Sequence, residues 1–229
     1  MPGAWDILRA RQNRLLIATP APPDLRVTMG WAASIRELQV PPGSDFMKIV
    51  GLPIAGCRNR ALVTALDGGY GGLFFLDADT VVPANCITVL LESGRDVIAA
   101  QYFQRYPPFK SAHAVIATNE KGEQYRGDIP PHAPGAIVPV DFLATGATYY
   151  SRRALEALRA NFRRPFEWGV DINPVPGDNN VDLPPISEDY MASLRLKALG
   201  FQPWLHSGLM CKHEFSAVAT EKGADMPAI

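Results

Sequence analysis

Apolar residues in the first half of the chain form short runs that alternate with stretches of helical periodicity. Within those stretches they recur every three or four positions, as Ala61, Leu62 and Ala65 do, which is the spacing of one helix face. Strands that alternate with helices predict a mainly parallel sheet with helices on both faces. The expected strands are 14–18, 46–50, 73–76 and 97–100, and the expected helices are 28–40, 56–66 and 83–93.

The second half of the chain has a less regular pattern. Ser151 is expected to cap one helix, and Ser187 another that Gly200 closes. A polar, proline-rich stretch at 171–185 suits no regular element, and we expect it to close as a lid over a bound ligand. The remaining elements are strands at 112–118, 136–140, 201–205 and 209–213, a turn-rich segment at 119–135, a bend into a strand at 141–150, and helices at 152–161 and 187–199.

Two carboxylates follow the most apolar of these runs. The stretch Leu73–Leu76 is typical of a strand buried on both faces, and Asp77 and Asp79 come directly after it, on either side of Ala78. Ligands of open α/β sheets bind at the carboxyl ends of strands, and oxygen ligands suit Mg²⁺ or Mn²⁺. The pattern therefore predicts a divalent-cation site, although a bare pair of aspartates also occurs in ordinary solvated turns.

Two later groups of polar residues are further candidates. Glu188 and Asp189 fall in the first turn of a predicted helix, where the helix macrodipole favours acidic residues. One of the two could also serve as a general base. His213 ends an apolar run, and a neutral imidazole could complete a carboxylate metal site. A single histidine is more often structural or exposed. The competing histidines are His113, His132 and His206.

Composition sets outer bounds on the function. The chain has 229 residues, of which 47% are hydrophobic and 20% charged, and its formal net charge of −1 provides no field that would recruit nucleic acid or an anionic membrane. Cys57, Cys86 and Cys211 are widely spaced and odd in number, which predicts neither a zinc site nor a disulfide framework. With no signal peptide or membrane-spanning run, we expect a cytoplasmic protein; its oligomeric state is not predicted.

The order of these motifs resembles the nucleotide-sugar glycosyltransferases of the GT-A fold, especially family 2-like members. The resemblance covers nearly the whole chain. It implies one α/β domain over 1–229, a Rossmann-like, mostly parallel mixed sheet flanked by helices, with a nucleotide-binding half at 1–100 and an acceptor and catalytic half at 101–229. The matching pieces are Thr19-Pro20, Gly56–Leu62, the D-x-D of Asp77–Asp79, Asp141–Arg153, Ser187–Tyr190 with Arg195 and Gly200-Phe201, and His213.

The resemblance also implies a role for each matching residue. The donor would be a nucleoside-diphosphate sugar, the acceptor an unidentified hydroxyl compound, and the cofactor Mn²⁺ or Mg²⁺. Asp189 would be the base of an inverting reaction, with Glu188 supporting it. Asp79 and His213 would bind the metal together with Asp77, which would also face the ribose or sugar side. The residues expected along the nucleotide sugar are Thr19, Pro20, Arg58, Asn59, Asp77, Ala78, Asp79 and Gly146.

Three other functions compete with this interpretation. Asp77 and Asp79 also match the first motif of haloacid dehalogenase-type phosphatases, and Gly177–Asp182 matches a later one, but no buried strand precedes that later match. Sugar nucleotidyltransferases share the scaffold, yet their glycine-rich signature after the first strand is absent here. A GT-A-like module that binds a nucleotide sugar or a partner without turnover is the non-catalytic alternative.

Overall fold

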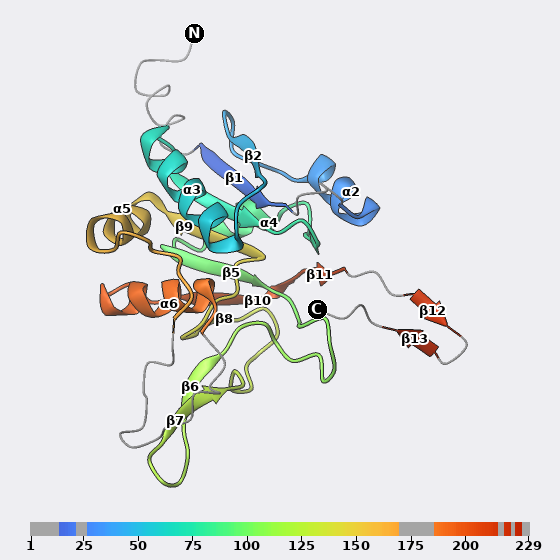
Figure 1. The fold of residues 1–229 in the computed structure, drawn as a ribbon, viewed down its shortest axis with the longest axis vertical. Coiled ribbons are helices and arrows are strands. Elements are labelled where there is room, and N and C mark those ends of the chain that lie inside the picture. The colour runs from blue at the N-terminus through green and yellow to red at the C-terminus, as the bar shows by residue number, and fades with distance from the viewer. Residues whose placement is uncertain (1–13, 22–26, 170–185, 215–217, 221–222, 226–229) are drawn as a thin grey trace.

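A seven-stranded sheet forms the centre of the molecule, in the strand order β2-β1-β3-β9-β5-β10-β8 (Figure 1). The structure is a computed structural model that describes residues 14–21, 27–169, 186–214, 218–220 and 223–225. The expected lid at 171–185 lies outside these residues. The sheet strands are β1 (Leu15–Pro20), β2 (Asp45–Ile49), β3 (Gly72–Leu76), β5 (Val97–Gln101), β8 (Ile137–Pro139), β9 (Ala147–Ser151) and β10 (Trp204–Met210).

Most strands of this sheet run in one direction. β1 pairs in parallel with both β2 and β3, and β10 pairs in parallel with β5. β9 is inserted antiparallel between β3 and β5, and β8 is antiparallel at the edge. The prediction of a mostly parallel mixed sheet is therefore confirmed, and the carboxyl ends of β1, β3, β5 and β10 meet at one edge.

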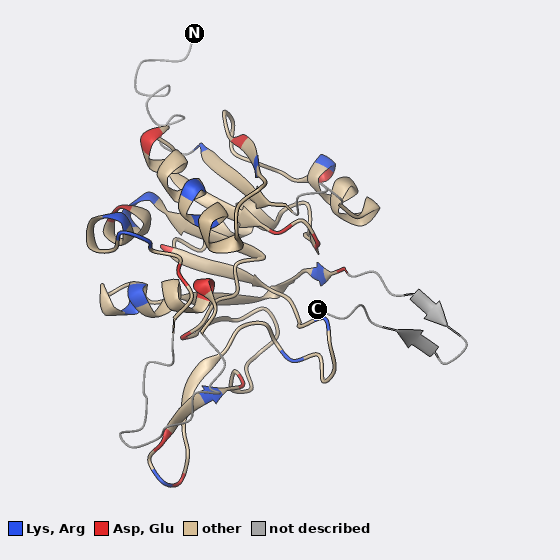
Figure 2. Ribbon diagram, viewed as in Figure 1, with Lys and Arg blue, Asp and Glu red and all other residues tan. Residues whose placement is uncertain are grey.

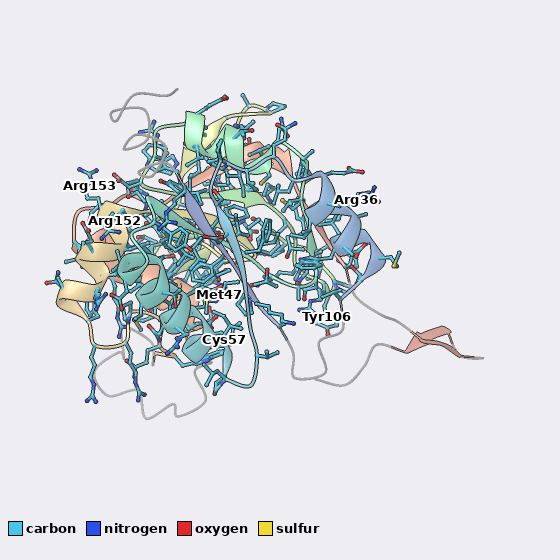
Figure 3. The ribbon with its side chains drawn as sticks, turned by 90° about the horizontal axis from the view of Figure 1, so that it is seen from above. Arg36, Met47, Cys57, Tyr106, Arg152 and Arg153 are labelled. Carbon is cyan, nitrogen blue, oxygen red and sulfur yellow. The ribbon has the colours of Figure 1, made fainter. Side chains whose placement is uncertain are left out.

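Alternating side chains of the buried strands build two apolar layers. Leu73 and Phe75 of β3 face the layer that includes α3, α5 and α6, whereas Phe74 and Leu76 face the layer that includes α4. Figure 3 shows side chains filling the space between α3 and the sheet, where Cys57 lies. The helices are α2 (Met29–Glu37), α3 (Ile54–Asp67), α4 (Cys86–Glu92), α5 (Arg152–Asn161) and α6 (Glu188–Ala198).

Two helices begin with a hydroxyl cap on the backbone, and a third does not. The Thr28 hydroxyl accepts a hydrogen bond from the Trp31 amide at 3.0 Å, and the Ser151 hydroxyl accepts one from the Ala154 amide at 3.2 Å. Helix α6 begins after Ser187 as predicted, but the Ser187 hydroxyl donates to the Asp189 carboxylate instead of capping the backbone. That difference turns the start of α6 into part of a polar cluster.

Two expectations about the second half were wrong. The segment 119–135, expected to be turn-rich and without a strand of its own, contains β7 (Gln124–Gly127), which pairs with β6 (Val115–Thr118) as a hairpin outside the main sheet (Figure 1). β7 is largely exposed, so it lacks the apolar alternation of a half-buried strand. The two strands expected at 201–205 and 209–213 are instead β10, which continues through an irregularity between His206 and Met210, and β11 (Lys212–His213).

Two further strand pairs lie outside the central sheet. β11 pairs antiparallel with β4 (Thr80–Val81), and β12 (Val218–Thr220) pairs with β13 (Gly223–Asp225). β1 reaches Pro20, which is paired with Ile49, so Thr19 and Pro20 belong to the strand rather than to the loop after it. Cys57, Cys86 and Cys211 are buried and free, as expected without a disulfide framework.

Charged residues lie mainly on helices and loops, while the strands of the central sheet are almost free of them (Figure 2). None of the helices in the described ranges is long and apolar enough to cross a membrane. The buried charged side chains of the described residues are Arg58, Glu188 and Asp189, and all three lie in one cluster near the end of β3. This concentration of buried charge marks the candidate site.

Candidate active site at the carboxyl edge of the sheet

The end of β3 carries the two predicted aspartates. The Asp77 amide donates to the Gly146 carbonyl at 2.9 Å, which ties the strand end to the loop before β9. Beyond Asp79, β4 pairs with β11 so that Thr80 lies opposite His213. The structure therefore brings Asp79 and His213 together, as the sequence analysis expected, through backbone pairing that is independent of their side chains.

Arg105 joins these two residues on the loop that follows β5. Its Nη2 lies 2.7 Å from Asp79 Oδ2, and its Nε donates to His213 Nε2 at 2.9 Å. Because His213 Nδ1 lies 3.0 Å from the Phe103 carbonyl, which can only accept, the ring carries its proton on Nδ1 and presents a lone pair at Nε2. Burial raises the pKa of Asp79, but the positive charge of Arg105 opposes this effect, and the pKa lies below its usual range.

Arg58 is the centre of a second, deeper cluster. It comes from α3 and is 3% exposed. Its Nη1 and Nη2 each lie 3.2 Å from one oxygen of Asp77, and its Nε donates to Glu188 Oε1 at 2.9 Å. Burial raises the pKa of Asp77, and burial together with the charge of Asp189 raises the pKa of Glu188, although Arg58 opposes both shifts.

Asp189 is held at the start of α6 by hydrogen bonds to both carboxylate oxygens. Oδ1 accepts from the Tyr190 amide at 2.8 Å and from the Ser187 hydroxyl, and Oδ2 accepts from the Thr145 amide at 3.3 Å. A carboxylate has about four lone-pair positions, so at least one stays available to a substrate hydroxyl. Thr145 is 1% exposed and its own hydroxyl has no hydrogen-bond partner among the described residues.

Two buried residues support this loop: Tyr102, which was not a candidate from the sequence, and His113, which was only a competing histidine. The Tyr102 hydroxyl accepts from the Gly146 amide at 2.8 Å, and a Cβ on Gly146 would lie 2.8 Å from that hydroxyl, so the position requires glycine. His113 Nε2 donates to the Ala100 carbonyl at 3.0 Å while Nδ1 accepts from the Ala144 amide at 3.3 Å. Burial lowers the pKa of His113 to about 4, so the ring is neutral. No sequence pattern distinguishes either residue.

The other competing histidines lie away from Asp79. His132 is exposed and bonds to the nearby Pro130 carbonyl, and His206 Nδ1 accepts from the Gly208 amide at 3.3 Å. Neither makes a hydrogen bond or ion pair with the aspartates among the described residues. Of the four histidines, His213 alone is therefore placed to complete a site with Asp79.

Some residues expected along the nucleotide sugar have other contacts. The Asn59 side chain bonds to the Ala55 carbonyl at 2.8 Å and to both the amide and the carbonyl of Phe166, at 3.1 and 2.6 Å, so it fastens α3 to the segment before 170. Thr19 and Pro20 are buried at the end of β1. Ala78 lies half-buried in the turn between the aspartates. A contact of these residues with a nucleotide stays a prediction.

The donor atoms suit a divalent cation in one place. No group of three or more His, Cys, Asp or Glu residues that could hold a metal occurs in the described part of the chain. Asp79 Oδ1 and His213 Nε2 lie 3.6 Å apart, and the guanidinium of Arg105 contacts both residues. Mg²⁺ and Mn²⁺ keep several positions for water and phosphate, so two protein ligands fit them. Asp77 is paired with Arg58 instead.

No protein-family model and no curated protein matches the sequence. Solved structures do match. The chain is similar to the crystal structure of A197 from STIV, with 16% identity and a TM-score of 0.57 over 92% of this chain and 91% of that chain. It is also similar to the crystal structure of GalNAc-T7 with UDP, GalNAc and Mn²⁺, with 10% identity and a TM-score of 0.54 over 87% of this chain.

The second match covers 43% of the GalNAc-T7 chain, so this protein corresponds to less than half of that structure. At such low identities the likeness concerns the fold. Together with the strand order, it confirms the fold class expected from the sequence: the chain has a GT-A-like fold, with a mostly parallel mixed sheet flanked by helices.

Proposed function

We propose that the protein is a glycosyltransferase that moves a sugar from a nucleoside-diphosphate sugar to an acceptor hydroxyl. The observation that carries the proposal is the meeting of two clusters at one sheet edge, joined through Asp77-Ala78-Asp79. The outer cluster offers a carboxylate and an imidazole lone pair, and the inner one offers buried carboxylates around Arg58. On a GT-A-like fold this edge is where a ligand binds, and UDP and Mn²⁺ in the GalNAc-T7 crystal support the same donor chemistry here.

Asp79 and His213 would hold Mn²⁺ or Mg²⁺ in this proposal. When bound, the cation would neutralise the negative charge on the diphosphate leaving group. Arg58 holds Asp77 in a fixed position beside it, and Tyr102 fixes Gly146. Rigid support of this kind favours a donor pocket whose shape is set before the ligand arrives.

Asp189 is the preferred base. In an inverting reaction the acceptor oxygen forms its bond to the sugar carbon as the bond from that carbon to the phosphate oxygen breaks, and the hydroxyl proton passes to a carboxylate. Glu188 is already paired with Arg58, whereas Asp189 accepts only hydrogen bonds from neutral donors. Consecutive helical residues point about 100° apart, so one of the two can face the acceptor squarely. We assign that role to Asp189 and a supporting role to Glu188.

The alternatives receive less support from the geometry. A haloacid dehalogenase-type reaction needs Asp77 as a nucleophile, yet both of its oxygens accept hydrogen bonds from Arg58. The second motif of that class, Gly177–Asp182, lies outside the described residues. A module that binds without turnover would not need Asp189, because a base has no role in binding alone.

A thermal-shift series tests the proposal. UDP and other nucleoside diphosphates are compared in Mn²⁺ and in EDTA, with Asp79→Asn and with Asp128→Asn as a matched control on an exposed carboxylate. A ligand at 100 times its Kd adds about 2.7 kcal/mol, which raises the Tm of a chain this size by roughly 5 °C or more. We expect that shift in Mn²⁺ for the parent and the control. If no nucleoside diphosphate shifts the Tm, or if Asp79→Asn responds like the parent, the proposed site is wrong.

A further inference from the structure

Arg105 occupies the place toward which two metal-ligating groups point. Its guanidinium lies 2.7 Å from Asp79 Oδ2 and donates to His213 Nε2 at 2.9 Å, while Asp79 Oδ1 and His213 Nε2 are 3.6 Å apart. The Nε2 lone pair that accepts the hydrogen bond from Arg105 is the one that a metal would need. A single lone pair serves one of these partners at a time, so the guanidinium and a metal exclude each other.

The ligand pair is built without help from Arg105. The pairing of β4 with β11 sets Thr80 opposite His213, and the Glu214 amide donates to the Asp79 carbonyl at 2.8 Å. His213 is further oriented by its bond to the Phe103 carbonyl. Withdrawal of the arginine would therefore leave the carboxylate and the imidazole in position.

Arg105 itself is held loosely. Its side chain is 40% exposed and projects from a loop outside any regular element, between β5 and β6. Ion pairs of such exposure contribute little, commonly less than about 1 kcal/mol. A permanent replacement for a metal would be expected to resemble Arg58, which is buried and fixed by a helix.

We propose that Arg105 is a built-in competitor for the divalent cation: it holds the Asp79–His213 position in the ligand-free protein and leaves it when the metal binds. The arginine then sets the metal affinity and compensates the charge of Asp79 when no metal is present. The inference rests on the metal position in the proposed function, but it requires neither a particular donor nor sugar transfer.

Direct Mn²⁺ binding, measured from the electron paramagnetic resonance signal of the free ion, tests this proposal without nucleotide. The variants are Arg105→Gln, Lys110→Gln and the double variant Arg105→Gln with Asp79→Asn. Lys110 is a matched control on the same loop, because it pairs with the exposed Asp128. We expect Arg105→Gln to bind Mn²⁺ about fivefold tighter than the parent. Lys110→Gln should stay within about twofold of the parent, and the double variant should lose the gain.

Three outcomes would overturn the inference. The first is an Arg105→Gln variant that binds Mn²⁺ no tighter than the parent or than Lys110→Gln. The second is the absence of Mn²⁺ binding by every variant. The third is a parent that binds UDP equally in Mn²⁺ and in EDTA and loses UDP with Arg105→Gln, since the arginine would then replace the metal.

The inference and the proposed function fail in distinguishable ways. Tighter Mn²⁺ binding by Arg105→Gln, with no binding of any nucleoside diphosphate, would support the competition and contradict the glycosyltransferase. Metal-dependent nucleotide binding that Arg105→Gln leaves unchanged, together with unchanged Mn²⁺ affinity, would contradict the competition and support the glycosyltransferase.

Discussion

Two arginines bind carboxylates at the same edge of the sheet, and they differ in how they are held. Arg58 projects from α3, is 3% exposed and bridges Asp77 and Glu188. Arg105 projects from a loop, and its side chain is 40% exposed where it meets Asp79. The inner cluster is enclosed by Phe75, whose ring centroid lies 5.1 Å from the Arg58 guanidinium carbon.

The difference separates a fixed part of the site from an exchangeable one. A buried ion pair that loses one partner leaves a charge without compensation, whereas an exposed pair is replaced by water at little cost. We therefore assign the Arg58 cluster to the framework of the site and the Arg105 cluster to cation exchange. The division predicts large costs for changes in the Arg58 cluster and small costs for changes in the Arg105 cluster.

The largest expected effect is on stability. Arg58→Ala should lower the free energy of unfolding by about 3–5 kcal/mol because it leaves Asp77 and Glu188 without their positively charged partner. Arg105→Ala should cost less than about 1 kcal/mol. Urea unfolding measures both, and Arg60→Ala, an exposed neighbour on the same helix, serves as the control. Equal costs for Arg58→Ala and Arg105→Ala would remove the distinction between the two clusters.

Acid should destabilise the protein through His113, which supports the loop beside the inner cluster. The pKa of His113 is lowered from 6.5 to about 4, so between these values the unfolded chain binds a proton that the folded chain does not. The stability that the neutral His113 ring contributes is therefore fully present above pH 6.5. As the pH falls toward 4, the free energy of unfolding decreases by about 3 kcal/mol in total. Protonation would also set an N–H against the Ala144 amide, which now donates to that nitrogen.

A pair of histidine variants measures this effect. His113→Gln keeps one donor and one acceptor but does not titrate, so the pH dependence of its unfolding free energy between pH 6.5 and 4 should be flatter than that of the parent. His132→Gln, at an exposed position, should follow the parent. Parallel curves for the parent and His113→Gln would show that this imidazole does not carry the acid sensitivity.

Transfer chemistry should depend on the inner cluster and metal binding on the outer one. Asp189→Asn keeps size and hydrogen bonding but removes the proton acceptor, so we expect sugar transfer to fall by about 10²-fold or more. Binding of Mn²⁺ and nucleoside diphosphate should stay within about twofold of the parent. Transfer at a near-parental rate would exclude Asp189 as the base, and loss of donor binding would place it in the donor pocket.

The smallest effects concern the loop that the two clusters share. Tyr102→Phe leaves the buried Gly146 amide without its acceptor and should cost about 1–3 kcal/mol. Thr145→Val removes a buried hydroxyl that has no partner among the described residues, so it should change stability by less than about 1 kcal/mol. Urea unfolding of the two variants gives the comparison. A Thr145→Val cost as large as that of Tyr102→Phe would indicate a partner for the hydroxyl in the folded protein.

The sequence revealed the parts of this site that local chemistry encodes. A strand buried on both faces leaves a continuous apolar run, so its end at Asp77 was visible, and Ser151 predicted its helix start by capping chemistry. The pairing of Arg58 with Glu188 spans 130 residues, and no local pattern indicates it. Arg105 lies in a loop without periodicity, so its contacts depend on how β4 and β11 place Asp79 and His213.

Long-range pairing also limited the prediction of the fold. The alternation of strands and helices indicated the parallel strands, but nothing in the chain marks β9 for insertion between β3 and β5. That insertion places the Thr145–Gly146 loop beside the aspartates. The helix at 187–199 was expected from its own residues, and the contact of Asp189 with this loop follows from the sheet order.

The most direct test of the proposed glycosyltransferase is slow hydrolysis of nucleotide sugars without an acceptor. A panel of nucleoside-diphosphate sugars is incubated with the parent and with Asp79→Asn, in Mn²⁺ and in EDTA, and release of the nucleoside diphosphate is measured. We predict release from at least one donor by the parent in Mn²⁺, and none by Asp79→Asn or in EDTA. Phosphate release from small phosphomonoesters with every nucleotide sugar intact would contradict the account and favour the phosphatase, and binding of a donor without any turnover would favour the non-catalytic module.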